Sequence, residues 1–314
     1  MTEIRPMVTS ATEAVGNTPL VRLRKIVPSG SADVYVKLES LNPTGSYKDR
    51  MALAMIEEAE KRGELRPGMK VVEYTGGSTG SSLAFVCAVK GYAFHVVSSD
   101  AFAREKLQTM RAFGAELEVI PSQNGQITRE LIQSMIERAT EIARDEQYYF
   151  TDQFNNRDSL KGYAQIGEEL VRQLDGPIDV YCGGVGTAGM LMGVATVLKG
   201  RDENTRIVGF EPASSAFLST GQRGAHHVEG IGVGFVPPLL DSSLYDEVRS
   251  IEEDEARKTA RRLAREEGIL AGTSSGLNVA GALQLAAALG QGHKVVTVAV
   301  DTGLKYLAGD LYAV

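Results

Sequence analysis

The chain alternates short β-branched or aromatic runs with segments of helical periodicity, and this alternation limits its fold more than any other feature. The runs are KVVEYT, FHVVSS, ELEVI, PIDVYC, RIVGFE and KVVTVAV, and they alternate with segments such as MALAMIEEAEKRG and AREKLQTMRAFG. Strands separated by helices form βα units, whose mainly parallel sheets are covered on both faces. Ligands bind at the carboxyl ends of such strands, so the loops after the strands are searched first.

Length and charge narrow the class further. The 314 residues favour two domains, and Asn, Pro and Gly cluster near residues 40–45 and 150–160, where we expect the chain to cross between them. The net charge of −7 argues against binding to nucleic acid or an anionic membrane, because both need a basic surface. A small-molecule ligand is therefore favoured.

Cysteine and histidine usage predicts neither disulfides nor a metal. Cys87 and Cys182 are too few for a disulfide framework and lack zinc-site spacing, so we expect both to be buried packing residues. The four histidines also lack ligand spacing, and no metal is predicted. A basic segment followed by an apolar run is absent from the first residues, and no apolar stretch is of membrane-spanning length, so a cytoplasmic protein is expected.

The first candidate loop is LNPTGSYKDRMA, which predicts a turn followed by a helix with Lys48 in its first turn. The positive end of a helix dipole disfavours an ammonium group, so this position favours the neutral, nucleophilic amine. Imine formation needs such an amine. The alternative is a surface lysine paired with Asp49 or another carboxylate.

The second loop is VVEYTGGSTGSSLAFVCAVKG, which reads as strand, glycine turn and a helix that begins near Thr79 or Gly80. Glycines let a ligand approach the backbone, and a helix start exposes N–H groups that bind a carboxylate or phosphate. The alternative is a plain turn with an N-cap.

The third loop, IDVYCGGVGTAGMLMGVATVLKG, has the same strand, glycine turn and helix order, with a G-x-G-x-x-G pattern at Gly184, Gly186 and Gly189. It predicts an anion-binding turn. It is also compatible with a dinucleotide fingerprint, in which Glu211 would bind the ribose.

One helix is bounded from local signals alone. Ser250 and Glu253 form an S-x-x-E capping box, and the following periodic segment ends at Gly268.

Taken in order, the three loops resemble those of the fold type II family of pyridoxal-phosphate (PLP) enzymes, in its cysteine synthase and cystathionine β-synthase branch. The similarity covers nearly the whole chain, from AVGNTPLVRL through NPTGSYKDR, TGGSTG, DQFNN, GGVGTAG and VGFEP to EGIGVGFVP, AREEGILAGTSSG and DTGLKYL. It implies an α/β fold of two domains, each a mainly parallel twisted sheet flanked by helices, with PLP in the cleft between them. Residues 1–44 plus 156–314 would form the larger, phosphate-binding domain, and residues 45–155 the smaller, mobile domain. The family resemblance also suggests a homodimer.

The resemblance further implies a reaction. Lys48 would carry PLP as a Schiff base and, once displaced by the substrate amino acid, remove its α-proton. Loss of the β-substituent from an activated serine, such as O-acetylserine, gives an α-aminoacrylate. A small nucleophile, sulfide in the parent activity, then adds to form cysteine or a related amino acid.

The resemblance assigns roles to particular residues as well. A hydroxyl of Thr302 would meet the pyridine nitrogen, which makes PLP a moderate electron sink suited to β-elimination and β-replacement. The implied cofactor-binding residues are Lys48, Ser78, Gly184, Gly186, Thr187, Ala188, Gly189 and Thr302. The implied contacts of the substrate carboxylate are Thr75, Gly76, Ser78, Thr79 and Gln153.

The chain departs from the family pattern in both glycine loops. The second loop of the family usually reads TSGNTG, whereas this chain has Gly76 and Ser78 in place of the Ser and the Asn. The phosphate loop usually reads GTGGT, and here Ala188 and Met190 replace a Gly and the last Thr. These differences affect the predicted substrate and nucleophile more than the cofactor, because backbone N–H groups can bind a phosphate whatever the side chains are.

Four alternatives stay open. Two lie within PLP chemistry, namely serine or threonine β-elimination and β-replacement with an amine nucleophile. From another class, an NAD(P)-dependent dehydrogenase would use the Gly184 loop with Glu211. A binding module would keep the fold without catalysis.

Overall fold

A computed structural model describes residues 7–126 and 128–313 of the protein. Internal contacts divide the chain into two compact units. The smaller unit holds the described residues up to Asn17 together with residues 42–44 and Lys48–Thr151. The larger unit holds Thr18–Leu41, Gly45–Tyr47 and the described residues from Asp152 onward. Within the described residues, no helix is long and apolar enough to cross a membrane.

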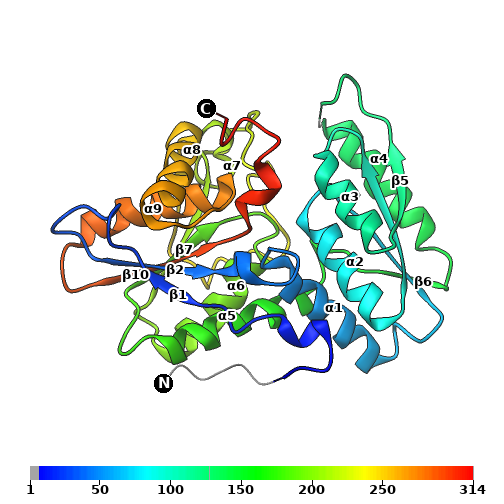
Figure 1. The fold of residues 1–314 in the computed structure, drawn as a ribbon, viewed down its shortest axis with the longest axis horizontal. Coiled ribbons are helices and arrows are strands. Elements are labelled where there is room, and N and C mark those ends of the chain that lie inside the picture. Colours follow the sequence, from blue (N-terminus) through cyan, green and yellow to red (C-terminus); the bar gives the residue numbers. More distant parts are fainter. Residues whose placement is uncertain (1–6, 127, 314) are drawn as a thin grey trace. The chain divides into compact units, whose positions relative to one another are not determined.

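The larger unit is a six-stranded sheet with helices on both faces. Its strands are β1 (Leu20–Arg22), β2 (Asp33–Leu38), β7 (Val180–Gly184), β8 (Arg206–Pro212), β9 (Glu247–Ile251) and β10 (Lys294–Ala299). Its helices are α5 (Asp158–Gln173), α6 (Gly189–Arg201), α7 (Phe217–Thr220), α8 (Glu253–Arg262) and α9 (Thr273–Leu289). The strand order is β1-β2-β10-β7-β8-β9, and only β1 runs antiparallel to its neighbour. Figure 1 shows α8 and α9 over one face and α5 and α6 over the other.

The core of the larger unit lies between this sheet and α9. Val34, Val180, Val208 and Val295 come from four neighbouring strands and are fully buried, as is Leu277 of α9. Burial of each such side chain stabilises the fold by about 1.5–3 kcal/mol. Because both faces are covered, the strands read as near-continuous apolar runs.

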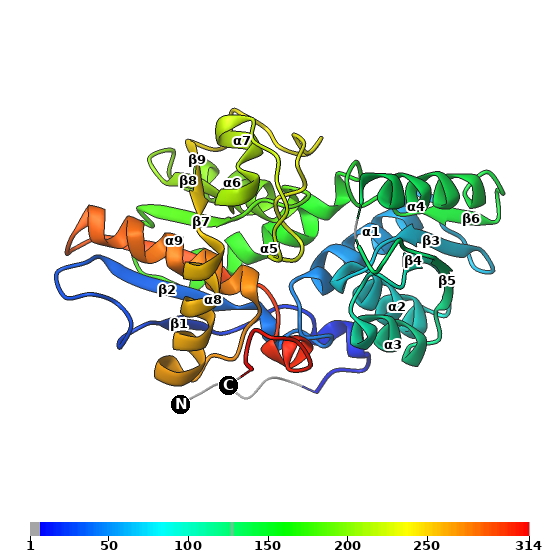
Figure 2. The ribbon, with the colours of Figure 1, turned by 90° about the horizontal axis from the view of Figure 1, so that it is seen from above.

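The smaller unit is a four-stranded parallel sheet in the order β5-β4-β3-β6. Its strands are β3 (Lys70–Tyr74), β4 (Ala93–Ser99), β5 (Glu116–Ile120) and β6 (Tyr148–Phe150), and its helices are α1 (Lys48–Arg62), α2 (Ser78–Lys90), α3 (Arg104–Ala112) and α4 (Arg129–Ile142). In Figure 2, α2 and α3 lie over one face of this sheet and α4 over the other. The predicted α/β architecture of mainly parallel sheets flanked by helices is confirmed.

The six predicted strands are all present, and four further strands were not predicted. Strands β1 and β6 have three residues each, too few for a periodic signal. Strand β2 contains Lys37, whose ammonium is fully buried and pairs with Glu169 at 2.6 Å. A lysine interrupts the apolar pattern that predicts a buried strand. Its burial becomes understandable only when the partner Glu169, distant in the sequence, is known.

The predicted capping box at Ser250 is wrong. Ser250 lies within β9, which extends to Ile251, and the N-cap of α8 is Glu252. The Glu253 carboxylate instead accepts hydrogen bonds from the backbone N–H of His227 and from its ring Nδ1, at 2.9 and 3.1 Å. The predicted end is confirmed, since a π-helical turn after α8 closes at Gly268 in a left-handed conformation.

Candidate active site

Lys48 is the first residue of α1, as predicted, and the residue is only 8% exposed. The alternative of a surface lysine is therefore wrong. The neighbouring Asp49 carboxylate accepts hydrogen bonds from the backbone N–H and the hydroxyl of Thr44, at 2.7 and 2.5 Å. This interaction closes the turn that precedes the helix.

Burial changes the acid–base behaviour of Lys48. Desolvation disfavours the ammonium form and lowers the pKa of Lys48 from 10.5 to about 8. An amine with this pKa is substantially neutral near pH 8, and only the neutral form attacks a carbonyl or accepts a proton.

The three residues before Lys48 are anchored to the larger unit. Tyr47 donates its backbone N–H to Val300 O at 3.0 Å, and Thr302 donates its N–H to Gly45 O at 2.9 Å. Gly45 has φ +74°, and a Cβ atom there would lie 2.6 Å from Thr302 Cγ2. Glycine is thus required by both backbone conformation and space. The chain passes into the smaller unit at the peptide bond that joins Tyr47 to Lys48.

The second glycine loop lies in the smaller unit, between β3 and α2. Helix α2 begins at Ser78, one residue earlier than expected, and its N-cap Gly77 provides no side-chain cap. The Thr75 hydroxyl accepts the N–H of Gly77 at 3.2 Å. Four of the five predicted carboxylate contacts, Thr75, Gly76, Ser78 and Thr79, therefore share one turn at a helix start.

The fifth predicted contact, Gln153, belongs to the larger unit and is buried. It follows Asp152, which has a left-handed backbone at φ 44°. Asp152 O accepts the N–H groups of Asn155 and Asn156 at 3.0 and 2.9 Å. These bonds turn the chain immediately after Gln153.

The third glycine loop joins β7 to α6 in the larger unit. Gly184 donates its N–H to Asn278 Oδ1 at 2.7 Å, and Val185 donates to Phe210 O at 2.8 Å. The N-cap of α6, Ala188, has φ 67° and provides no side-chain cap. The N-cap residue of this 13-residue helix therefore gives the N–H groups of the first turn no side-chain cap.

The backbone N–H groups of the next three residues, 186–188, are left available. All three residues are buried, yet in the described part of the chain no acceptor is found for these N–H groups. Buried N–H groups are nearly always satisfied. A cluster of them at a helix start fits an anionic group such as a phosphate, whose oxygens would accept these bonds.

Asn278 is a residue that the sequence analysis missed. It is fully buried in α9, and besides accepting from Gly184 it donates through Nδ2 to Val298 O at 3.1 Å. It thereby ties the end of β7 to β10. The only sequence signal was an amide near the start of the apolar stretch LNVAGALQLAAAL.

Two hydroxyl groups lie near the carboxyl end of β10. The segment after β10 is bonded to the segment before α9, since Gly272 donates to Asp301 O at 3.2 Å and Gly303 to Leu270 O at 3.0 Å. The Thr302 hydroxyl accepts the N–H of Leu304 at 3.3 Å. Ser274, in the first turn of α9, is 4% exposed, and its hydroxyl has no hydrogen-bond partner among the described residues. The sequence analysis missed Ser274.

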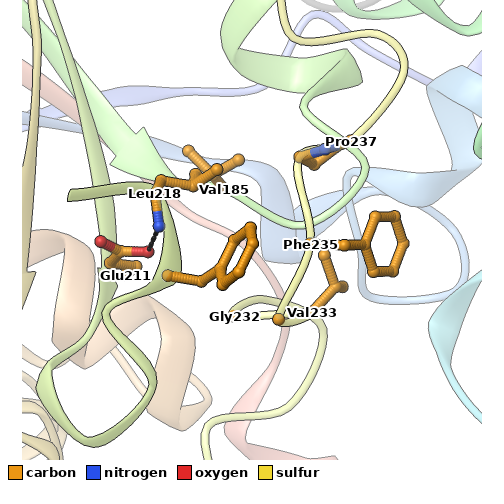
Figure 3. A pocket seen from close by; sticks show the side chains of 9 residues that line it. Val185, Glu211, Leu218, Gly232, Val233, Phe235 and Pro237 are labelled. Carbon is orange, nitrogen blue, oxygen red and sulfur yellow. Dashed lines mark hydrogen bonds between the residues drawn. The ribbon is translucent and has the colours of Figure 1, made fainter. Parts of the chain in front are cut away.

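Glu211 does not serve as a free ribose-binding acid. Its carboxylate is buried and accepts the N–H groups of Leu218 and Ser219, each at 2.8 Å. Figure 3 shows this carboxylate turned toward Leu218, beside a small hollow that is also lined by Val185 and residues 232–235. Both oxygens bond within the fold, which argues against the dinucleotide alternative.

Comparisons with known proteins agree with this geometry. The family described as "Pyridoxal-phosphate dependent enzyme" matches residues 11–301. A cysteine synthase of Staphylococcus aureus (strain Mu50 / ATCC 700699) is 43% identical over 308 residues, which are 98% of this chain and 97% of the relative.

Two solved structures are also similar. A cysteine synthase (OASS) of Entamoeba histolytica aligns with a TM-score of 0.94 and 31% identity, over 100% of this chain and 93% of that chain. An O-ureido-L-serine synthase aligns with a TM-score of 0.91 and 36% identity, over 98% of this chain and 96% of that chain.

Proposed function

Because the chain belongs to the family of pyridoxal-phosphate dependent enzymes, we propose that it catalyses β-replacement on O-acetylserine, with sulfide as the nucleophile and cysteine as the product. The observation that carries this proposal is Lys48, a buried amine with a pKa lowered to about 8 at the start of α1. Such an amine serves both to attach the cofactor and to move the α-proton.

The residues present fit the cofactor. The N–H groups of residues 186–188 suit its phosphate, Lys48 suits its attachment, and a hydroxyl of Thr302 or Ser274 suits its ring nitrogen. Ser78 stands where the family has an Asn, so its role toward the cofactor stays a prediction. When bound, PLP supplies an electron sink for the charge that develops at the substrate Cα.

The chain's own residues supply binding and proton transfer. We assign the substrate carboxylate to the turn of residues 75–79 at the start of α2, with Gln153 as an additional donor. A helix start favours an anion, so this turn orients the amino acid by its charged end. Lys48 Nζ then takes the proton from Cα and returns it at the end of the cycle.

We retain two further predictions about the whole protein. The smaller domain, which contains Lys48–Thr151, would move relative to the larger domain and keep water from the reacting atoms. The family resemblance supports a homodimer, and the cytoplasmic location expected from the sequence stays a prediction. Sedimentation at micromolar concentration, which separates a monomer of 33.7 kDa from a dimer, tests the oligomeric state.

A second candidate is β-replacement with a nucleophile other than sulfide. Gly76 and Ser78 depart from the family pattern in the carboxylate turn. One similar structure is named for a product that carries a ureido group instead of sulfur. Because of both observations, the test must identify the nucleophile as well as the cofactor.

The test is an absorbance and product assay on protein purified with PLP. O-acetyl-L-serine, O-phospho-L-serine, L-serine and L-threonine are added in turn, with and without sulfide. We expect visible absorption that shifts with O-acetyl-L-serine, and cysteine only when sulfide is present. Keto-acid release without cysteine would favour β-elimination, and protein that takes up no PLP would overturn the proposal.

The two candidate hydroxyls are distinguished by single substitutions. We expect Ser274→Ala to lower kcat by about 10-fold, the effect of losing one hydrogen bond of about 1.4 kcal/mol, and to shift the absorption maximum of the bound cofactor. Thr302→Ala is expected to change both less, because Thr302 is only partly buried whereas Ser274 is 4% exposed, and a hydrogen bond is stronger where water is excluded. If Thr302→Ala has the larger effect on both readouts, the ring nitrogen belongs to Thr302.

A further inference from the structure

An aromatic ring lies directly on the carboxylate turn of the smaller unit. A Cβ atom built on Gly76 would overlap the ring atoms Cγ, Cδ1 and Cδ2 of Phe102. These are the base and body of the ring, so a small rotation of a flexible end would not make room. Position 76 therefore accepts only glycine while Phe102 keeps its place. The family's usual Ser at this position would not fit beside the ring.

Phe102 is held by the turn between β4 and α3. Its backbone N–H donates to Ser99 O at 3.3 Å, and Ala101 donates to Ser99 Oγ at 3.2 Å. The Asp100 carboxylate accepts the Ser99 hydroxyl at 3.2 Å and the N–H of Ser122 at 2.7 Å. Hydrogen bonds with Ser122 and Ser99 lower the pKa of Asp100, which favours its carboxylate form. The ring is thus carried by an ordered turn that is bonded to the chain beyond β5.

The ring packs on the Cβ side of a residue whose backbone donor is unsatisfied. Gly76 is buried, and its N–H has no acceptor in the described portion of the chain. Removal of water from such a donor strengthens its bond to an anion, because the local dielectric is low. A phenyl ring on the Cβ side of the glycine also limits the conformations of an otherwise permissive residue.

We infer that Phe102 is a positioning residue for the substrate carboxylate, acting through the Gly76 backbone. In this chain the ring replaces the hydroxyl side chain of the family loop with an apolar cover, so the carboxylate is recognised here by a sheltered backbone N–H. The inference rests on the proposed function, since it assumes that residues 75–79 bind the substrate carboxylate. Phe102 makes no contact with the reacting atoms in this role.

Phe102→Ala is the first test. We expect KM for O-acetyl-L-serine to rise about 10-fold with kcat changed by less than about 2-fold, as lost ground-state binding requires. Phe102→Leu, which keeps most of the apolar volume, should recover most of the affinity. Phe113→Ala is the matched control, because Phe113 is a partly buried aromatic at the C-terminal end of α3 and packs on Phe85. It should leave KM unchanged.

A binding measurement separates carboxylate recognition from general loosening of the fold. L-alanine and L-alaninamide both lack a leaving group, and only L-alanine carries a carboxylate. Their dissociation constants are read from the absorbance of the bound cofactor. Phe102→Ala should raise the dissociation constant of L-alanine by about 10-fold and that of L-alaninamide much less. The reason is the loss of one sheltered hydrogen bond to a charged carboxylate. Equal weakening of both ligands would overturn the inference.

A double-substitution cycle tests the contact itself. Gly76→Ala should weaken the binding of L-alanine, because the Phe102 ring must move to make room for the new Cβ atom. The double variant Gly76→Ala with Phe102→Ala should bind L-alanine more tightly than Gly76→Ala alone. Additive effects would contradict a direct contact. The assay also separates the two proposals. If the wild-type protein binds L-alanine but forms no cysteine, the proposed reaction is refuted. The effect of Phe102 on carboxylate binding can still be measured with L-alanine in that case.

Discussion

Lys48→Met is expected to abolish turnover and, at the same time, to stabilise the cofactor-free protein near pH 7. Turnover should fall by about 10³-fold or more, because the group that moves the α-proton is lost. The fold disfavours the Lys48 ammonium, as the lowered pKa of about 8 indicates. Met fills a similar volume without a charge, so the free energy of unfolding should rise by about 2–3 kcal/mol.

The pH dependence of this stability difference follows from the sign of the pKa change. The pKa of Lys48 is lower in the folded chain, about 8, than its ordinary value of 10.5. The unfolded chain therefore binds more protons, and the burial penalty is fully present below about pH 8. It shrinks as the pH rises from 8 to 10.5 and is absent above that range. The advantage of Lys48→Met should disappear in the same range.

Denaturant unfolding of the cofactor-free proteins at several pH values measures this difference. Lys61→Met is the matched control, because Lys61 lies in the same helix with its side chain 67% exposed and forms an exposed ion pair with Glu58. It should change stability little at any pH. Equal stability of Lys48→Met and wild type at pH 7 would refute the penalty assigned to Lys48.

Gly186→Ala is expected to remove PLP binding. Its Cβ atom would collide with Gly230 O, a backbone atom that cannot move independently. The turn must open, which disperses the N–H groups of residues 186–188 that we assign to the phosphate. Loss of several charge-assisted hydrogen bonds should lower the affinity for PLP by about 100-fold or more. The strain should also lower the free energy of unfolding by about 1–3 kcal/mol.

Gly200→Ala provides the control for this substitution. Gly200 lies near the C-terminal end of α6, the helix that follows the Gly186 turn, and a Cβ atom there would meet nothing within 4 Å. Ala at an unstrained helical position should stabilise by about 0.4–1 kcal/mol without affecting PLP. Both variants are assayed by PLP titration of the apoprotein. Unchanged PLP affinity in Gly186→Ala would show that the phosphate lies elsewhere.

Much of the fold was predictable because its signals are local. The strand, glycine turn and helix order around Gly76 and Gly184 follows from residues within a few positions of one another, and it appears in the structure within one or two residues of the expected places. The helix start at Lys48 was predicted in the same way from the preceding NPTGSY turn. Turn chemistry and periodicity depend on near neighbours, which a single sequence displays in full.

Features that depend on distant residues were not predictable. The N-cap at Glu252 was missed because β9 extends through Ser250, which the pairing of β9 with β8 decides. The sequence suggested a helix-dipole effect on Lys48, whereas burial lowers its pKa. The local sequence did not reveal the roles of Asn278 and Ser274, since their surroundings come from strands and turns elsewhere in the chain.

By itself, therefore, the sequence determined the α/β order of elements, the three loops that carry chemistry and the family resemblance, because all of these are read along the chain. Only the tertiary structure decided which groups are dry, which donors lack an acceptor and which side chain occupies the space beside a glycine. Phe102 on Gly76 shows the reason. Solvation and steric fit are set by the packing of segments that are far apart in sequence, and no local pattern encodes them.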